Sequence, residues 1–151
     1  MRVNGHIALL ASMLIVGCGG TNSSSPAAPA APAPTIDIGG VWSGTAADEG
    51  GPGTLTWQVT QSSNRISGTV SSEDRGTGLK SSGSLSGTLA GSSLTFTIAI
   101  PAGGYSGVNS CNAATANLSG SATASAGTIS GSYSGPVCGG NVNGTFELHK
   151  Q

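Results

Sequence analysis

ISGTV (residues 66–70) and LSGTL (residues 85–89) share one pattern. A central glycine has a small polar residue on each side, and an apolar residue stands at each end of the five-residue segment. The pattern returns as WSGTA (42–46), LSGSA (118–122), ISGSY (129–133) and VNGTF (142–146). In each copy the glycine lies two positions from the flanking apolar residues, so in a β-strand all three share one face. The repeat therefore predicts strands with a glycine on the apolar inner face and Ser or Thr on the outer face.

Two further segments alternate in the same way but carry no glycine at the inward position. TLTWQVT (54–60) places Leu55, Trp57 and Val59 on one face, and SLTFTIAI (93–100) does so with larger aliphatic and aromatic residues. We expect these two bulky strands to fill the space that the glycines of the other six leave. Between residues 36 and 151 no apolar period of 3.6 residues indicates a helix.

Short polar or Gly/Pro-rich segments separate the alternating runs, as is typical of antiparallel meanders. The fold class is therefore predicted as all-β: an eight-stranded antiparallel up-and-down barrel, with a two-sheet β-sandwich as the alternative. Strands are expected near 40–47, 54–61, 64–72, 82–90, 93–100, 113–124, 127–134 and 142–149.

The N-terminus has the features of an export signal. A positive charge at Arg2 precedes the apolar run 7–16, which is shorter than the roughly 20 residues that a membrane-spanning helix needs. Ile15-Val16-Gly17-Cys18 resembles the lipobox of bacterial lipoproteins. The resemblance implies cleavage before Cys18, lipidation of its thiol and acylation, including palmitate, of its new amino group.

Three regions follow from this interpretation: a signal peptide (1–17), a lipidated N-terminus with an Ala/Pro/Ser-rich linker (18–35), and a β-barrel domain (36–151). Several acyl chains make a lasting membrane anchor. Gly19 stands where lipoproteins that stay at the inner membrane often have Asp. We therefore expect a lipid-anchored, monomeric protein of the bacterial cell envelope, at the outer membrane, with its orientation left open.

With Cys18 lipidated, Cys111 and Cys138 remain, and in an exported protein they are expected to form a disulfide. No third cysteine or nearby histidine suggests a metal site instead, so no metal ligand is predicted.

Composition argues against two classes of function. With five Lys and Arg residues and a net charge of −1, the chain offers no basic stripe for nucleic acid. The mature chain retains one histidine, His149, which falls on an outward position. Its adjacent carboxylate pairs, Asp48-Glu49 and Glu73-Asp74, occur in turns, where we expect them to be solvated. We therefore predict no enzyme activity and no cofactor.

Gly40-Val41-Trp42, at the start of the first strand, resembles the Gly-x-Trp signature that opens lipocalins and related calycins. ISGTV also resembles the third-strand segment of avidin-like barrels. The resemblance implies a calycin-like barrel in which Trp42 packs across the base. The last strand lacks the Arg that stacks on this Trp in the family, and Lys150 is its nearest cation. Biotin binding is not implied, because two tryptophans cannot form the tryptophan cage of biotin binders.

Two functions remain. The first is a non-catalytic barrel that binds a small hydrophobic ligand, with Trp57, Phe96, Tyr133 and Phe146 as candidate lining residues. The second is a surface or envelope module without an internal ligand, whose outer Ser and Thr rows contact protein or glycan. Among the aromatic residues, Tyr105 is expected to lie outside the barrel, in the long loop 101–110.

Overall fold

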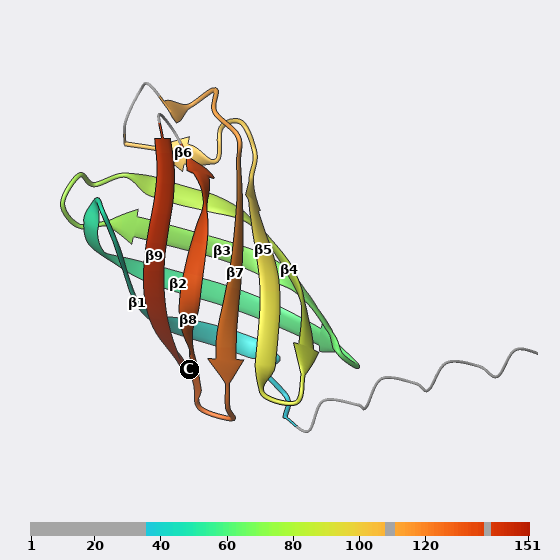
Figure 1. Cartoon of the computed structure of the whole chain (residues 1–151). Coiled ribbons are helices and arrows are strands. Elements are labelled where there is room, and N and C mark those ends of the chain that lie inside the picture. Colours follow the sequence, from blue (N-terminus) through green and yellow to red (C-terminus); the bar gives the residue numbers. More distant parts are fainter. Residues whose placement is uncertain (1–35, 108–110, 138–139) are drawn as a thin grey trace, which may run out of the picture. The chain divides into compact units, whose positions relative to one another are not determined.

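The computed structural model describes residues 36–107, 111–137 and 140–151, and these form a β-barrel (Figure 1). The predicted signal peptide, Cys18, the linker and Cys138 lie outside the described residues. The strands are β1 (Gly40–Asp48), β2 (Gly51–Ser62), β3 (Arg65–Asp74), β4 (Lys80–Ala90), β5 (Ser93–Ile100), β6 (Tyr105–Ser106), β7 (Ala116–Ala124), β8 (Thr128–Val137) and β9 (Gly140–Lys150).

Eight of these strands form a closed ring in chain order. Each pairs antiparallel with the next, from β1 to β5 and then from β7 to β9, and β9 returns to pair with β1. The short β6 pairs with β4 beside the ring, Ser81 opposite Tyr105. The predicted eight-stranded up-and-down barrel is confirmed. The sandwich alternative is wrong, because the β3–β4 and β1–β9 pairings leave one continuous sheet.

Strand boundaries differ from the predicted ones mainly at the turns. β1 and β2 continue to Asp48 and from Gly51, because the Asp48 side chain accepts the backbone N–H of Gly50 (2.8 Å) and tightens the turn to two residues. β7 begins three residues later than predicted. β6 lies in the segment predicted to be a loop.

The repeated glycines face inward, as their spacing predicts, and four of them (Gly44, Gly68, Gly87 and Gly131) lie first against neighbouring backbone. A Cβ atom on Gly44 would run into the carbonyl oxygen of Glu147, and one on Gly68 into that of Gln58. These glycines therefore do more than save volume, because they allow the next strand to come closer than any side chain would permit.

Large and small inward residues alternate along one of the cross-strand rows. Phe96 pairs with Gly87 on one side and with Gly120 on the other. One row around the barrel runs Asp48, Gly144, Tyr133, Gly120, Phe96, Gly87 and Ile66. Phe96, from one of the two bulky strands, therefore uses the space beside two glycines, and Tyr133, from a strand that itself carries an inward glycine, does the same.

One end of the barrel is closed by the segment before β1. Trp42 is fully buried and donates its indole N–H to the carbonyl of Ile38 (2.8 Å), and the Ile38 N–H donates to Gln61 Oε1 (2.8 Å). The Nζ atom of Lys150 lies 5.5 Å from the centre of the Trp42 ring, within cation–π range. Trp42 thus packs across the base, as the resemblance to calycins implies.

We predict that Gly68→Ala destabilises the barrel by about 1–3 kcal/mol, because the added methyl group must displace the backbone of β2. Gly127→Ala is the matched control: a Cβ there meets nothing within 4 Å, and the backbone carries no positive φ. Denaturant unfolding of both variants measures the difference. Equal stability of Gly68→Ala and the wild type would contradict the close approach of β2 and β3.

Candidate functional site

A cavity of about 390 Å³ opens at the end of the barrel opposite Trp42. The β1–β2 and β3–β4 turns, the end of β8, the start of β9 and β6 surround this end (Figure 1). Its walls are mainly aliphatic side chains at inward positions: Leu55, Val70, Ile98, Ile100, Leu118 and Val142. These strand ends bring mostly aliphatic residues inward, so the barrel is filled less completely here than at its centre.

The centre of the barrel is packed with aromatic rings. The ring centre of Trp57 lies 5.1 Å from those of Phe96 and Phe146, which are themselves 5.6 Å apart, and Tyr133 lies 6.4 Å from Phe146. The structure thus brings the four candidate lining residues into one cluster. Tyr133 also lines the cavity, whereas the other three lie deeper along their strands and are not part of its lining.

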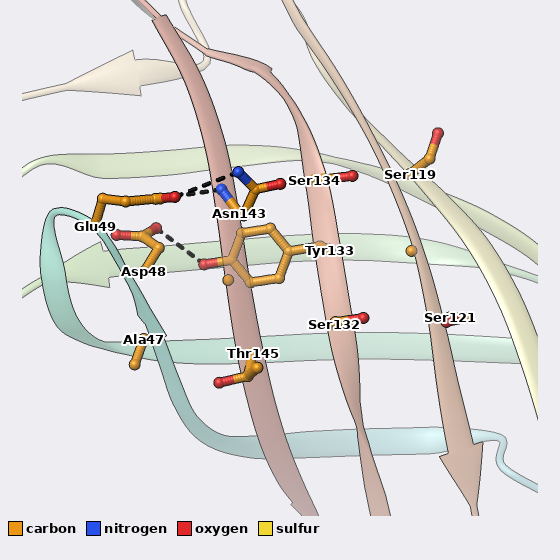
Figure 2. A pocket seen from close by; sticks show the side chains of 12 residues that line it. Ala47, Asp48, Glu49, Ser119, Ser121, Ser132, Tyr133, Ser134, Asn143 and Thr145 are labelled. Carbon is orange, nitrogen blue, oxygen red and sulfur yellow. Dashed lines mark hydrogen bonds between the residues drawn. The ribbon is translucent and has the colours of Figure 1, made fainter.

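Asp48 connects this cluster to the rim of the cavity. Its Oδ2 atom accepts a hydrogen bond from the Tyr133 hydroxyl group (3.0 Å), as Figure 2 shows. Burial raises the pKa of Tyr133 well above its usual range, and the negative charges of Asp48, Glu49 and Asp74 raise it further. The tyrosine is therefore a neutral donor to a carboxylate.

Asp74, at the end of β3, is the second inward carboxylate at the rim. Its Oδ1 atom accepts the backbone N–H groups of Gly76 (2.7 Å) and Thr77 (2.9 Å). A methyl carbon on Gly50 would lie 2.9 Å from Asp74 Oδ2 and 3.1 Å from Asp48 Oδ1, so the two carboxylates flank Gly50.

Glu49 belongs to the same turn but bonds on the outer face. It accepts the backbone N–H of Asn143 (3.0 Å) and the side-chain amide of the same residue (3.3 Å), as Figure 2 shows. The backbone hydrogen bond from Asn143 is the main cause that holds the pKa of Glu49 below its usual value. These bonds fasten the β1–β2 turn to β9.

Tyr105 lines the cavity from β6 and is 4% exposed, so the expectation that it lies outside the barrel is wrong. The pairing of β6 with β4 carries it inward. Its hydroxyl group has no hydrogen-bond partner among the described residues. Burial raises its pKa. Ser72 and Ser81, whose hydroxyl oxygens lie 2.7 Å apart, add a polar patch to the same wall.

The positively charged side chains near Asp74 in the sequence, and His149, are not among the residues that line the cavity. Lys80 contacts Glu73 across the outer face (3.5 Å), and Arg75 is exposed and is not among the lining residues. His149 pairs with Glu147 on the outer face of β9 (3.2 Å). In the described ranges, no group of three or more histidines, cysteines or carboxylates could hold a metal ion.

A second, shallow hollow lies on the outer face of β7, β8 and β9 (Figure 2). Glycines thin the wall there, so that Tyr133 contributes to this hollow as well as to the cavity. Exposed polar side chains line it: Ser119, Ser121, Ser132, Ser134, Asn143 and Thr145. This is the Ser/Thr-rich outer face on which the alternative function depends.

Other candidate residues are placed only in part. Cys111 is buried, at 4% exposure, but Cys138 lies outside the described residues, so the disulfide stays a prediction. The lipidation of Cys18 stays a prediction for the same reason. Among the described residues, no helix is long and apolar enough to cross a membrane.

Sequence reasoning treated Asp48 and Asp74 as solvated turn residues and missed them as part of a site. The alternation of inward and outward residues along the two strands already indicated that these carboxylates face inward. Asp48 shares parity with Trp42 and Gly44, and Asp74 shares parity with Ile66 and Val70. Extending each strand by two residues would have placed both carboxylates inside the mouth. No comparable signal marks Tyr105.

No protein-family model matches the chain, and no curated protein matches it. Function must therefore be inferred from the barrel, its cavity and the polar groups at the rim.

We predict that Tyr133→Phe lowers the free energy of unfolding by about 1–3 kcal/mol at neutral pH, because Asp48 loses a donor. The difference should shrink as the pH rises above about 10. There the unfolded wild type ionises its tyrosine while the folded state, with its raised pKa, holds the proton, so the wild type loses stability that the variant never had.

Urea unfolding at neutral and alkaline pH measures this difference. Tyr105→Phe is the control at neutral pH, because it removes a hydroxyl group without a partner and should cost little. If the difference in unfolding free energy between wild type and Tyr133→Phe does not change with pH, the hydrogen bond from a neutral Tyr133 to Asp48 is contradicted.

Proposed function

We propose that the protein is a lipid-anchored lipoprotein of the bacterial cell envelope whose barrel binds a small, largely apolar molecule without catalysing a reaction. The observation that carries the proposal is the cavity of about 390 Å³ above a packed aromatic floor. Small-molecule sites commonly enclose about 300–1,000 Å³, with apolar walls and a few polar groups. Leu118, Ile98 and Val142 provide such walls, and Tyr105 and Asp48 provide polar groups.

The features around the cavity support a calycin-like carrier. Trp42 is buried at the base, as the Gly-x-Trp signature implies, and Lys150 lies over its ring where the family has Arg. We place the anchor at Cys18, the barrel at the outer membrane as a monomer, and a disulfide between Cys111 and Cys138. These parts of the proposal come from the sequence.

The absence of catalysis is proposed from where the reactive side chains lie. His149 and its partner Glu147 are on the outer face, away from the cavity. The carboxyl groups of Asp48 and Asp74 accept hydrogen bonds from the chain and, among the described residues, neither has a histidine beside it.

The second candidate is a surface module that contacts protein or glycan through the outer hollow. The observation that favours it is the gathering of exposed hydroxyl and amide groups on β7–β9. Aromatic platforms for sugar stacking do not accompany them, since Tyr133 has its ring on the inner side of Gly144. We therefore place ligand binding first.

We predict that the full-length protein purified from its own host carries a small molecule that native mass spectrometry detects. The same protein should bind the neutral fluorescent probe N-phenyl-1-naphthylamine. Val142→Trp fills the cavity and should weaken probe binding by about tenfold or more, because the probe and the indole compete for one space.

Val41→Trp is the matched control, since Val41 is 43% exposed on the outer face and its substitution should leave binding unchanged. Melting curves of both variants verify folding. Wild-type protein that neither carries a molecule nor binds the probe would contradict the carrier function, and so would equal binding by Val142→Trp.

A further inference from the structure

We propose that the mouth of the cavity selects a cationic amphiphile, in which an amine or quaternary ammonium group is attached to an apolar body. The inference depends on the proposed ligand-binding function and specifies the chemistry of the same site. Asp48 and Asp74 receive the positive head at the rim, and the aliphatic walls receive the apolar body.

The two carboxylates occupy one side of the mouth and converge on the same turn. Both flank Gly50, which has no side chain to separate them. A positive group placed near this turn would interact with both oxygens at once. Opposite charges within a few ångströms attract strongly where protein excludes part of the solvent.

The hydrogen bonds at the rim leave acceptor capacity on both carboxylates for a ligand. Among the described residues, nothing donates to Oδ2 of Asp74, while its Oδ1 holds two backbone N–H groups and fixes the carboxylate in place. Asp48 accepts one donor on each oxygen, from Gly50 and Tyr133. Each carboxylate is thus oriented by the chain and still has lone pairs to accept from an ammonium group.

No positive side chain among the described lining residues neutralises the mouth. Lys80 is engaged with Glu73 on the outer face, and Arg75 does not line the cavity. The negative field reaches inward, since Asp48, Glu49 and Asp74 all act on the Tyr133 hydroxyl. This negative field would repel an anionic head group and attract a cationic one.

Tyr105 gives an independent indication that the cavity takes a ligand with a polar group. The residue is only 4% exposed, yet its hydroxyl has no partner among the described residues. Buried hydroxyl groups in proteins are nearly always hydrogen-bonded, because leaving one unpaired is costly. A polar atom of a bound ligand would complete the bonding of Tyr105, which lines the same cavity as the two carboxylates.

The test compares decylamine, decanol and decanoate as competitors of the naphthylamine probe on the full-length protein, each below its micelle concentration. These share a chain length and differ in head-group charge. We expect decylamine to bind about tenfold tighter than decanol, because a charge-assisted hydrogen bond to the rim contributes about that much affinity. Decanoate should bind more weakly than both.

Asp48→Asn combined with Asp74→Asn should abolish the preference for decylamine over decanol. Each asparagine keeps an oxygen for the backbone N–H groups of its turn. Asp37→Asn combined with Glu147→Gln is the control: it changes the net charge equally at two positions outside the cavity lining and should keep the preference. If the double variant does not fold, Asp74→Asn alone should reduce the preference.

The outcomes separate the two proposals. If decanol binds but decylamine binds no tighter, the cationic selectivity is overturned and the carrier function stands. Equal loss of preference in the control pair would also overturn it, because net charge rather than the rim would then set affinity. If neither the probe nor any competitor binds, both proposals fall.

Discussion

The close approach of neighbouring strands at the inward glycines is the constraint on which the rest of the barrel depends. At Gly44 and Gly68 the facing carbonyl oxygen occupies the place where a Cβ atom would stand. Backbone this close lets the sheet coil tightly enough for β9 to meet β1, and closure removes the free edges that a sheet of exposed strands would present. The lost side-chain volume is then made up by large residues on adjacent strands.

The same arrangement determines where the interior is full and where it is hollow. At the centre, Phe96 sits between two glycines, and Trp57, Phe146 and Tyr133 complete the aromatic floor. At the base, Trp42 and Ile38 close the end. Toward the mouth the inward residues become aliphatic and then acidic, so an apolar cavity with a negative rim remains. Packing and binding are thus two results of one pattern.

Much of the fold could be predicted because period-two alternation survives in every long strand, and the order of strands follows from short turns. Closure was expected from the number of strands alone, since the pairing of β1 with β9 joins the two ends of the domain and leaves no local mark in the sequence. The site was less accessible. The four aromatic residues were recognised, but their depth depends on register, and Tyr105 is placed by β6, a two-residue strand whose pairing with β4 has no local signal. Asp48 and Asp74 were misjudged because turn-like composition outweighed their parity.

The most direct measurement of the role of the inward glycines is a double-mutant cycle between Gly144 and Tyr133, because the nearest atoms that a Cβ on Gly144 would meet all belong to the Tyr133 side chain. We expect Gly144→Ala to be clearly destabilising in the wild type and nearly neutral in the Tyr133→Ala background, with a coupling of about 1–3 kcal/mol in the free energy of unfolding. Additive effects, with a coupling near zero, would contradict the claim that glycine makes room for the neighbouring ring.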